Sequence, residues 1–293
     1  MSEQYRHAVH TWMFGGLPLE RTMECLTQIG FCADLSIQDR GDSSPERIIE
    51  LQEKRGVFQG MTPVCTAMFT DETLNLSSSD PAGRRRAVEF GKRCVEAAGC
   101  AGADRLLVSP SSVVTGARCC RSREDDWRTA VESLREIGEF ALGHGVSLMI
   151  EPINRYRVAL VHTVAEALRM AEMTGLENVG VVPDVFHMCM EEVAGVPEAI
   201  RSAGDRLLCL HIGSSTRNVP GADRFDWTPV LWSLCKARYS GVFSYEPAVL
   251  YFDEKRVERD ARYREEFLEK LRRGKEHLEE LSKRIQETLS VGK

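Results

Sequence analysis

The chain has 293 residues, which is enough to bury the core of one α/β barrel or of two smaller domains. Its formal net charge is −6, which argues against a nucleic-acid or anionic-membrane partner because both call for a basic surface. No long apolar run follows the polar start of the chain, and the ten cysteines form no Cys-x-x-Cys pair, so we expect a cytoplasmic protein with reduced thiols, without signal peptide or membrane span.

Apolar runs and helical patterns divide the chain into eight strand–helix units. The predicted strands lie, in chain order, at residues 8–10, 31–37, 61–68, 105–108, 147–150, 179–182, 207–210 and 242–245. The predicted helices begin near residues 18, 45, 80, 124, 163, 193 and 228, and a charged helical tail from residue 257 is broken at Gly274. No Pro- or Gly-rich linker separates two halves. We therefore predict one (β/α)₈ TIM barrel over residues 1–293, with 275–293 as a C-terminal helical extension.

Four consecutive strands, the fifth to the eighth, end in an ionisable residue: Glu151, Asp184, His211 and Glu246. Proline follows both glutamates and ends the strand, because proline cannot donate a ladder hydrogen bond. Burying a carboxylate is costly unless a cation or hydrogen-bond donors meet it. Since the carboxyl ends of barrel strands share one face, we predict that the four side chains converge there. The alternative is that they are unrelated polar residues at the starts of four loops.

A set of three carboxylates and one histidine, with no sulfur, suits a hard divalent cation better than a cysteine-type zinc site. We expect one ion, Mn²⁺ first, with Mg²⁺ or Co²⁺ as alternatives. If coordination positions stay open, a substrate carbonyl and the adjacent hydroxyl can bind there, and the ion acts as a Lewis acid for an enediolate.

Each of the four residues stands in a longer motif. The motifs are Glu151-Pro-Ile-Asn154-Arg155-Tyr156, Asp184-Val-Phe-His187-Met, His211-Ile-Gly-Ser-Ser-Thr-Arg217 and Tyr245-Glu246-Pro, with His10-Thr-Trp-Met-Phe-Gly near the N-terminus. Together they resemble the sugar isomerase/epimerase superfamily of xylose isomerase-like TIM barrels, and within it the D-tagatose 3-epimerase-like ketose 3-epimerases. The likeness spans nearly the whole chain.

The resemblance implies a homo-oligomeric enzyme, a dimer or tetramer, that epimerises or isomerises a ketose or related sugar. It implies that Glu151, Asp184, His211 and Glu246 hold the divalent ion. It also implies that Glu151 and Glu246 are the acid–base pair, in which one carboxylate removes the proton next to the carbonyl and the other returns a proton on the opposite face.

The same resemblance assigns His187 and Arg217 to the binding of substrate hydroxyl and carbonyl groups. A loop histidine that caps a helix and a solvated arginine are the plainer interpretations of these two residues. Trp12 and Phe14 either wall the pocket or pack in the core.

Four features depart from the pattern of the ketose epimerases. Arg157 stands where a substrate-binding glutamate is usual, Ser36 stands near the place of a strand-two glutamate, and Ser214 replaces an acidic residue. The usual glycine-rich Pro-Gly-x-Gly loop reads Pro220-Gly221-Ala222-Asp223. The metal frame is thus retained while the substrate-binding residues differ. We hypothesise a substrate with an acidic or phosphorylated end that Arg157 meets; the alternative is that Arg157 points to solvent.

Other functions stay open. A related metal-dependent enzyme, inosose dehydratase-like or hydroxypyruvate isomerase-like, would use the same frame, as would a non-catalytic sugar-binding relative. An apurinic-site endonuclease is disfavoured by only seven histidines and the negative charge. The apolar stripe of the tail predicts that its first half closes the barrel and that its second half packs on a neighbouring subunit.

Overall fold

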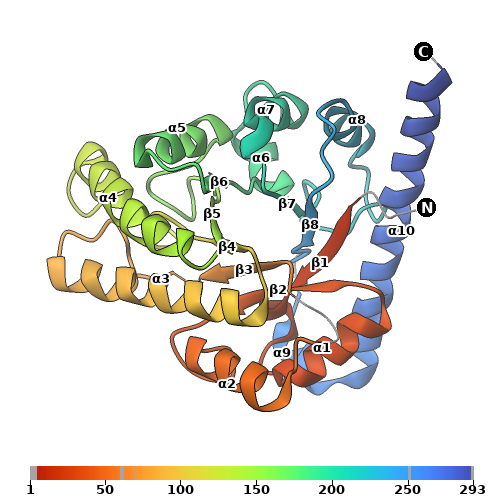
Figure 1. Ribbon diagram of the computed structural model, residues 1–293. Coiled ribbons are helices and arrows are strands. Elements are labelled where there is room, and N and C mark those ends of the chain that lie inside the picture. Colours follow the sequence, from red (N-terminus) through yellow and green to blue (C-terminus); the bar gives the residue numbers. More distant parts are fainter. Residues whose placement is uncertain (1–4, 60–62, 69, 250–251, 292–293) are drawn as a thin grey trace.

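The computed structural model describes residues 5–59, 63–68, 70–249 and 252–291 (Figure 1). Within these residues one parallel sheet of eight strands has the order β6-β5-β4-β3-β2-β1-β8-β7. Bridges between Val181 and Leu207 and between Asp184 and His211 join β6 to β7 and close the barrel. The strands are β1 (Arg6–His10), β2 (Cys32–Ile37), β3 (Cys65–Met68), β4 (Arg105–Leu107), β5 (Ser147–Ile150), β6 (Val179–Val181), β7 (Cys209–Ile212) and β8 (Val242–Tyr245). The predicted TIM barrel is confirmed; the expected start of the third strand at Met61 lies outside the described residues.

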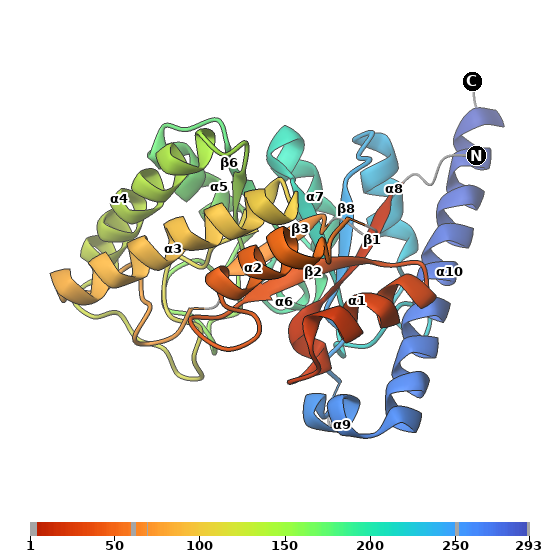
Figure 2. The ribbon, with the colours of Figure 1, turned by 60° about the horizontal axis from the view of Figure 1, so that its bottom comes forward.

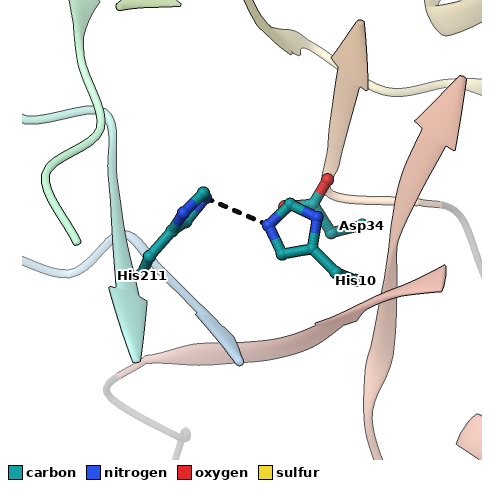
Figure 3. A group of neighbouring side chains, drawn as sticks. All are labelled: His10, Asp34 and His211. Atoms are coloured by element: carbon teal, nitrogen blue, oxygen red, sulfur yellow. Dashed lines mark hydrogen bonds and ion pairs between the residues drawn. The ribbon is translucent and has the colours of Figure 1, made fainter. Parts of the chain in front are cut away.

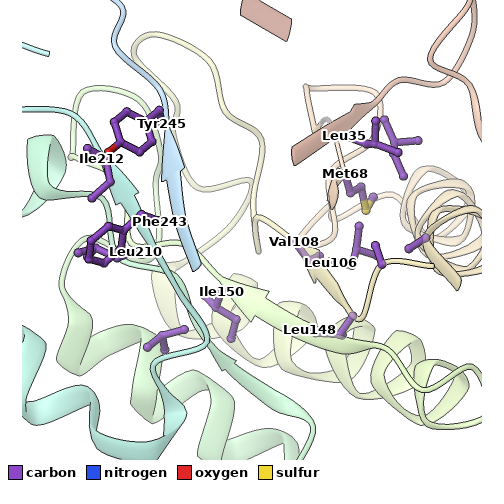
Figure 4. Packing of buried hydrophobic residues seen from close by; sticks show 14 of the residues in the cluster. Leu35, Met68, Leu106, Val108, Leu148, Ile150, Leu210, Ile212, Phe243 and Tyr245 are labelled. Atoms are coloured by element: carbon purple, nitrogen blue, oxygen red, sulfur yellow. The ribbon is translucent and has the colours of Figure 1, made fainter. Parts of the chain in front are cut away.

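Side chains alternate between the two faces of each strand, and this alternation separates two apolar clusters. One cluster joins the strands to the surrounding helices through residues such as Leu148, Ile150, Leu210 and Phe243 (Figure 4). The smaller cluster consists of intervening residues, among them Met149, and fills the barrel interior. The interior is therefore packed with apolar side chains below the mouth.

Helices surround the barrel, and most begin and end at residues that cap them. Ser44, Asp80, Ser122 and Thr163 each accept a hydrogen bond from a backbone N–H of the first helical turn. The helices are α1 (Leu19–Gln28), α2 (Pro45–Arg55), α3 (Pro81–Ala101), α4 (Arg123–Leu142), α5 (Val164–Thr174), α6 (Val185–Glu191), α7 (Val196–Ala203), α8 (Thr228–Lys236), α9 (Glu254–Arg259) and α10 (Ala261–Val291). Short 3₁₀ turns cover Thr11–Phe14 and Gly204–Arg206. None of the described helices is long and apolar enough to cross a membrane.

The helix expected around residues 193–203 is present as α7, but a short helix before it was not anticipated, and an expected helix break is absent. The helix expected around residues 193–203 is preceded by a separate short helix, α6, which begins directly after Asp184 because that carboxylate caps it. The break expected at Gly274 is absent, and α10 runs through this position. A Cβ atom at Gly274 would lie 3.1 Å from Val219 Cβ and 3.1 Å from Pro220 Cδ. Glycine is present there because a loop packs closely on the helix, at a modest cost in helix propensity.

Most of the apolar stripe of α10 is covered within the chain itself. Leu278 and Ile285 are buried in the main core, and the Lys275 Nζ atom donates to the Gly30 backbone oxygen at 2.9 Å. Figure 2 shows α10 along one flank of the barrel beside β1 and α8. Leu281 and Leu289 are only partly buried in the single chain, so the packing of the second half of the tail on a neighbouring subunit stays a prediction.

Candidate active site

The polar side chains at the barrel mouth come from residues that stand two positions after a residue of the barrel interior. Met149, Val182 and Cys209 belong to the interior cluster, and Glu151, Asp184 and His211 come two residues after them. Since side chains two residues apart on a strand share a face, all three point into the barrel. Glu246 follows β8 in the same way, two residues after the buried Ser244.

The structure brings these four side chains together. Glu151, Asp184, His211 and Glu246 each offer one ligand atom, and these atoms all lie within 4.8 Å of one another. Glu151 Oε1 lies 3.0 Å from His211 Nδ1. Asp184 and His211 are each 1% exposed. The alternative of four unrelated loop residues is therefore wrong.

Both oxygens of Glu246 are held by donors from other parts of the chain. Trp12 Nε1 donates to Oε1 at 2.9 Å, and Arg217 Nη2 donates to Oε2 at 2.7 Å. Burial alone would raise the pKa of the Glu246 carboxyl, but the Arg217 guanidinium, supported by His10 and His211, lowers that pKa to about 2. Glu246 is thus oriented and ionised at neutral pH.

The pKa values of Asp184 and His211 are also shifted, because both side chains are buried next to other charged groups. Burial raises the pKa of Asp184, although the charges of His187 and Arg217 oppose this shift. Burial opposes the charged form of His211, yet the adjacent Glu151 carboxylate raises the pKa of that imidazole well above its usual range. Three carboxylates so close together are favourable only when cations lie among them.

A divalent cation fits this set of ligand atoms. Asp184 uses Oδ1 to accept from the Phe186 backbone N–H at 2.9 Å, whereas its buried Oδ2 has no hydrogen-bond partner among the described residues. A carboxylate oxygen that accepts no hydrogen bond and faces two more carboxylates and an imidazole nitrogen is what a hard divalent ion requires. The identity of the ion stays a prediction.

A cavity of about 740 Å³ opens beside the four residues. Of the side chains predicted to meet substrate, Trp12, His187, Arg217 and Arg157 line it. Phe14 does not: its side chain is completely buried, and its ring centroid lies 5.9 Å from that of Phe267 in the core. We therefore assign Phe14 to packing rather than to the pocket wall.

Neighbouring side chains hold His187 and Arg217 in place. The Asn154 amide donates to His187 Nδ1 at 2.9 Å, so the ring hydrogen of His187 is on Nε2, which faces Asp184 at 3.8 Å. Arg217 has a backbone φ of 57°, in the left-handed region, and its guanidinium lies 5.0 Å from the Phe186 ring centroid. A strained backbone of this kind is typical of functional positions.

The residues that depart from the family pattern have different surroundings. Arg157 is exposed at the cavity wall, and its guanidinium makes no ion pair with the described residues. The hydroxyl of Ser36 accepts from the Trp12 backbone N–H at 3.2 Å. Ser214 donates to the carboxylate of Asp223, which the sequence analysis named only as the last residue of the altered glycine-rich loop.

Sequence reasoning also missed His10 and Asp34 as parts of the site. Both are buried next to His211. A usable signal was present, because Asp34 interrupts an otherwise apolar strand at a position that shares a face with the interior residue Cys32.

Comparisons with known proteins agree with this geometry. The model of the family described as "Xylose isomerase-like TIM barrel" matches residues 26–273. D-psicose 3-epimerase of Enterocloster bolteae is 30% identical over 221 residues, which are 71% of this chain and 68% of that relative. D-psicose 3-epimerase of Ruminiclostridium cellulolyticum is 36% identical over 127 residues, so the match spans only 43% of either chain. A solved structure of L-ribulose 3-epimerase superimposes with a TM-score of 0.82 at 23% identity, covering 98% of this chain and 97% of that one.

Proposed function

Because the chain belongs to the xylose isomerase-like TIM barrel family, we propose that it is a divalent-metal-dependent epimerase of a ketose or related sugar. The observation that carries this proposal is the convergence of Glu151 and Glu246. They come from strand ends three strands apart in the barrel, yet each places a carboxylate oxygen in one group with Asp184 and His211. Two carboxylates that approach a substrate from different sides can invert a stereocentre, whereas a single base returns the proton to the side from which it came.

The protein residues have distinct tasks in the proposed reaction. One glutamate takes the proton from the carbon next to the carbonyl, and the electron pair of that C–H bond moves toward the carbonyl oxygen. The other glutamate, which carries a proton taken from solvent before the step, delivers that proton to the opposite face of the same carbon, and the first glutamate returns its proton to solvent afterwards. Trp12 and Arg217 keep the Glu246 carboxylate in one orientation during both steps. We assign the Nε2–H of His187 to a substrate hydroxyl or carbonyl oxygen at the cavity wall.

Glu151, Asp184, His211 and Glu246 would hold the metal ion, with Mn²⁺ as the first candidate. When bound, such an ion supplies Lewis-acid polarisation of the substrate oxygens and offsets the negative charge that develops on them. The buried Oδ2 of Asp184, which accepts no hydrogen bond from the described residues, supports this assignment.

We further propose that Arg157 selects substrates with an anionic end. Its guanidinium lies on the cavity wall and makes no ion pair within the part of the chain that the structure describes, and a guanidinium binds a carboxylate or phosphate through two parallel hydrogen bonds. The variant Arg157→Glu is expected to shift kcat/KM from sugar phosphates toward neutral ketoses. An unchanged ratio would remove this part of the proposal.

Deuterium exchange tests the reaction itself. The Mn²⁺-loaded protein is incubated in D₂O with ketoses, ketose phosphates and inososes, and the products are analysed by NMR and mass spectrometry. We expect uptake of one deuterium at the carbon next to the carbonyl, together with the epimer. Glu151→Gln and Glu246→Gln are each expected to abolish formation of the epimer. A product with a new double bond would instead indicate dehydration, and a metal-loaded protein that exchanges no substrate proton would contradict the proposal.

A further inference from the structure

Three ionisable side chains from three strands meet inside the barrel on the far side of His211 from Glu151. They are His10 at the end of β1, Asp34 in β2 and His211 in β7 (Figure 3). The parallel register places His10 opposite Asp34, and His211 is the partner of Ser244 on β8. Their exposed fractions are 3%, 1% and 1%. TIM barrels usually fill this region with branched apolar side chains, so a buried carboxylate and a second imidazole need an explanation.

The His10 imidazole contacts both His211 and Asp34. His10 Nε2 lies 3.2 Å from His211 Nε2 and 3.4 Å from Asp34 Oδ2. The two imidazole rings are nearly perpendicular, with an interplanar angle of 87°. Asp34 Oδ2 also accepts from the Ser244 hydroxyl at 2.7 Å, which fixes the carboxylate from the opposite side. The three side chains therefore form a chain of contacts that ends on the Nε2 atom of His211.

The other nitrogen of His211 faces the proposed metal ligands. Nδ1 lies 3.0 Å from Glu151 Oε1, and an imidazole nitrogen must be free of hydrogen to bind a metal ion. The ring hydrogen then sits on Nε2 and is directed at His10 Nε2. A histidine that binds a metal commonly donates its second N–H to a protein acceptor, which fixes the ring and makes it a stronger ligand.

We infer that His10 and Asp34 are positioning residues for His211: they hold the imidazole with Nδ1 toward the metal ligands and Nε2–H toward His10. The Asp34 carboxylate, whose Oδ2 lies 3.4 Å from His10 Nε2, supplies a negative charge that favours a hydrogen at this contact. The inference rests on the proposed role of His211 as a metal ligand. It goes beyond that role, because it assigns a task to two residues that touch neither metal nor substrate.

A second cation held by His10, Asp34 and His211 is the competing explanation, since their ligand atoms lie within 4.8 Å of one another. Such an ion would have only two ligands of its own. It would also require His211 to bind metal through both nitrogens and to lose its last ring hydrogen. The positioning role requires neither metal binding through both nitrogens nor the loss of this hydrogen, so we favour it. The experiment below measures the number of bound ions.

The test measures metal binding directly and does not depend on turnover. Mn²⁺ is titrated into the metal-free protein by isothermal titration calorimetry, and the absorption spectrum of the Co²⁺-loaded protein reports the ligand geometry. The variants are His10→Phe, which keeps a ring but removes the acceptor, and Asp34→Asn, which keeps the volume but removes the charge. His7→Phe is the matched control. His7 lies on the same strand as His10 and is 3% exposed, but its Nδ1 atom contacts Tyr245 Oη at 3.0 Å instead of the site.

We expect one Mn²⁺ per chain in the wild type. His10→Phe is expected to bind it about 10- to 100-fold more weakly with a changed Co²⁺ spectrum, and Asp34→Asn should show a smaller loss in the same direction. His10→Gln returns a side-chain acceptor and is expected to recover part of the affinity. His7→Phe should leave affinity and spectrum unchanged even if it lowers the melting temperature.

Two results would overturn the inference. One is wild-type affinity and an unaltered Co²⁺ spectrum in Asp34→Asn and in any folded His10 variant. The other is a stoichiometry of two ions that falls to one in Asp34→Asn, which would establish the second cation instead. A protein that binds Mn²⁺ as expected but turns over no sugar would refute the proposed function and leave this inference standing.

Discussion

Removing the Arg217 guanidinium tests the electrostatic balance of the site. Arg217→Met keeps the length of the side chain but leaves Glu246 and Asp184 without the half-buried guanidinium that pairs with both. The pKa of Glu246 falls from 4.5 to about 2 mainly because of Arg217, and a shift of this size corresponds to about 3 kcal/mol. The histidines carry part of the shift, so we expect Arg217→Met to lower the free energy of unfolding of the metal-free protein by about 2–3 kcal/mol at pH 7.

The pH dependence of this loss has a definite sign. A carboxyl group whose pKa is depressed in the folded state stabilises the protein above its unfolded-state pKa, and this contribution is lost as the pH falls through the folded-state pKa. For Glu246 the window therefore lies between about pH 4.5 and pH 2. The difference between wild type and Arg217→Met should be largest at neutral pH and should shrink below pH 4.5.

Urea unfolding in the presence of EDTA, at pH 7 and at pH 3.5, measures both quantities. Arg238→Met is the matched control, because Arg238 also has a positive φ, 55°, but is exposed and makes no ion pair with the described residues. Its free energy of unfolding should change by no more than about 0.5 kcal/mol. A loss below about 1 kcal/mol for Arg217→Met, or a loss that is equal at both pH values, would refute the reasoning.

Three further substitutions separate packing from function. Phe14→Ala should lower the free energy of unfolding by about 3–5 kcal/mol, because its ring is completely buried against Phe267; a change in KM without loss of stability in chemical denaturation would return Phe14 to the pocket. Asn154→Ala removes the donor to His187 Nδ1. KM should therefore rise about tenfold, as for a lost hydrogen bond to a positioned group, while the melting temperature stays nearly constant. Unchanged steady-state kinetics would contradict this role of Asn154. Gly274→Val adds side-chain atoms at a position where even a Cβ atom would lie 3.1 Å from the loop. We expect the free energy of unfolding, measured by thermal unfolding, to fall by about 1–3 kcal/mol. An increase in stability would mean that helix propensity dominates at this position.

The sequence predicted the parts of the molecule that follow from strand period and barrel geometry. Glu151 and Glu246 were found because proline follows each of them and because strand ends of one barrel share a face. Asp34 was missed because it lies within a strand, where a polar residue is easily taken for a break in an apolar run. His10 ends β1, but the sequence analysis named it only as part of a motif. Their connection to His211 depends on the register between strands far apart in sequence, and a single chain does not reveal that register.

The helical elements show a second limit. The short helix α6 has only seven residues and carries no helical period that could be recognised. It forms because the Asp184 carboxylate accepts from the Phe186 backbone N–H, so the residue predicted as a metal ligand is also the cap of the helix that carries His187. At Gly274 the local signal favoured a break, but the close approach of the loop at Val219 accounts for the glycine.

The departures from the family pattern differ in whether the structure compensates for them. Ser214 lacks the expected carboxylate, but Asp223 supplies one to the same loop, where its carboxylate accepts from the hydroxyls of Ser214 and Thr216. These hydrogen bonds lower the pKa of Asp223 against the opposing effect of its burial, so the negative charge stays in the loop that presents Arg217.

Arg157 has no such counterpart. Its guanidinium has no carboxylate partner among the described residues, and it replaces a negative charge by a positive one at the cavity wall. A compensated change preserves the shape and charge of a site, whereas an uncompensated one changes what the site attracts. The choice of substrate in this chain should therefore depend on Arg157 far more than on Ser214. Accordingly, Ser214→Asp should leave the ratio of kcat/KM for charged and neutral sugars unchanged under conditions in which Arg157→Glu reverses it.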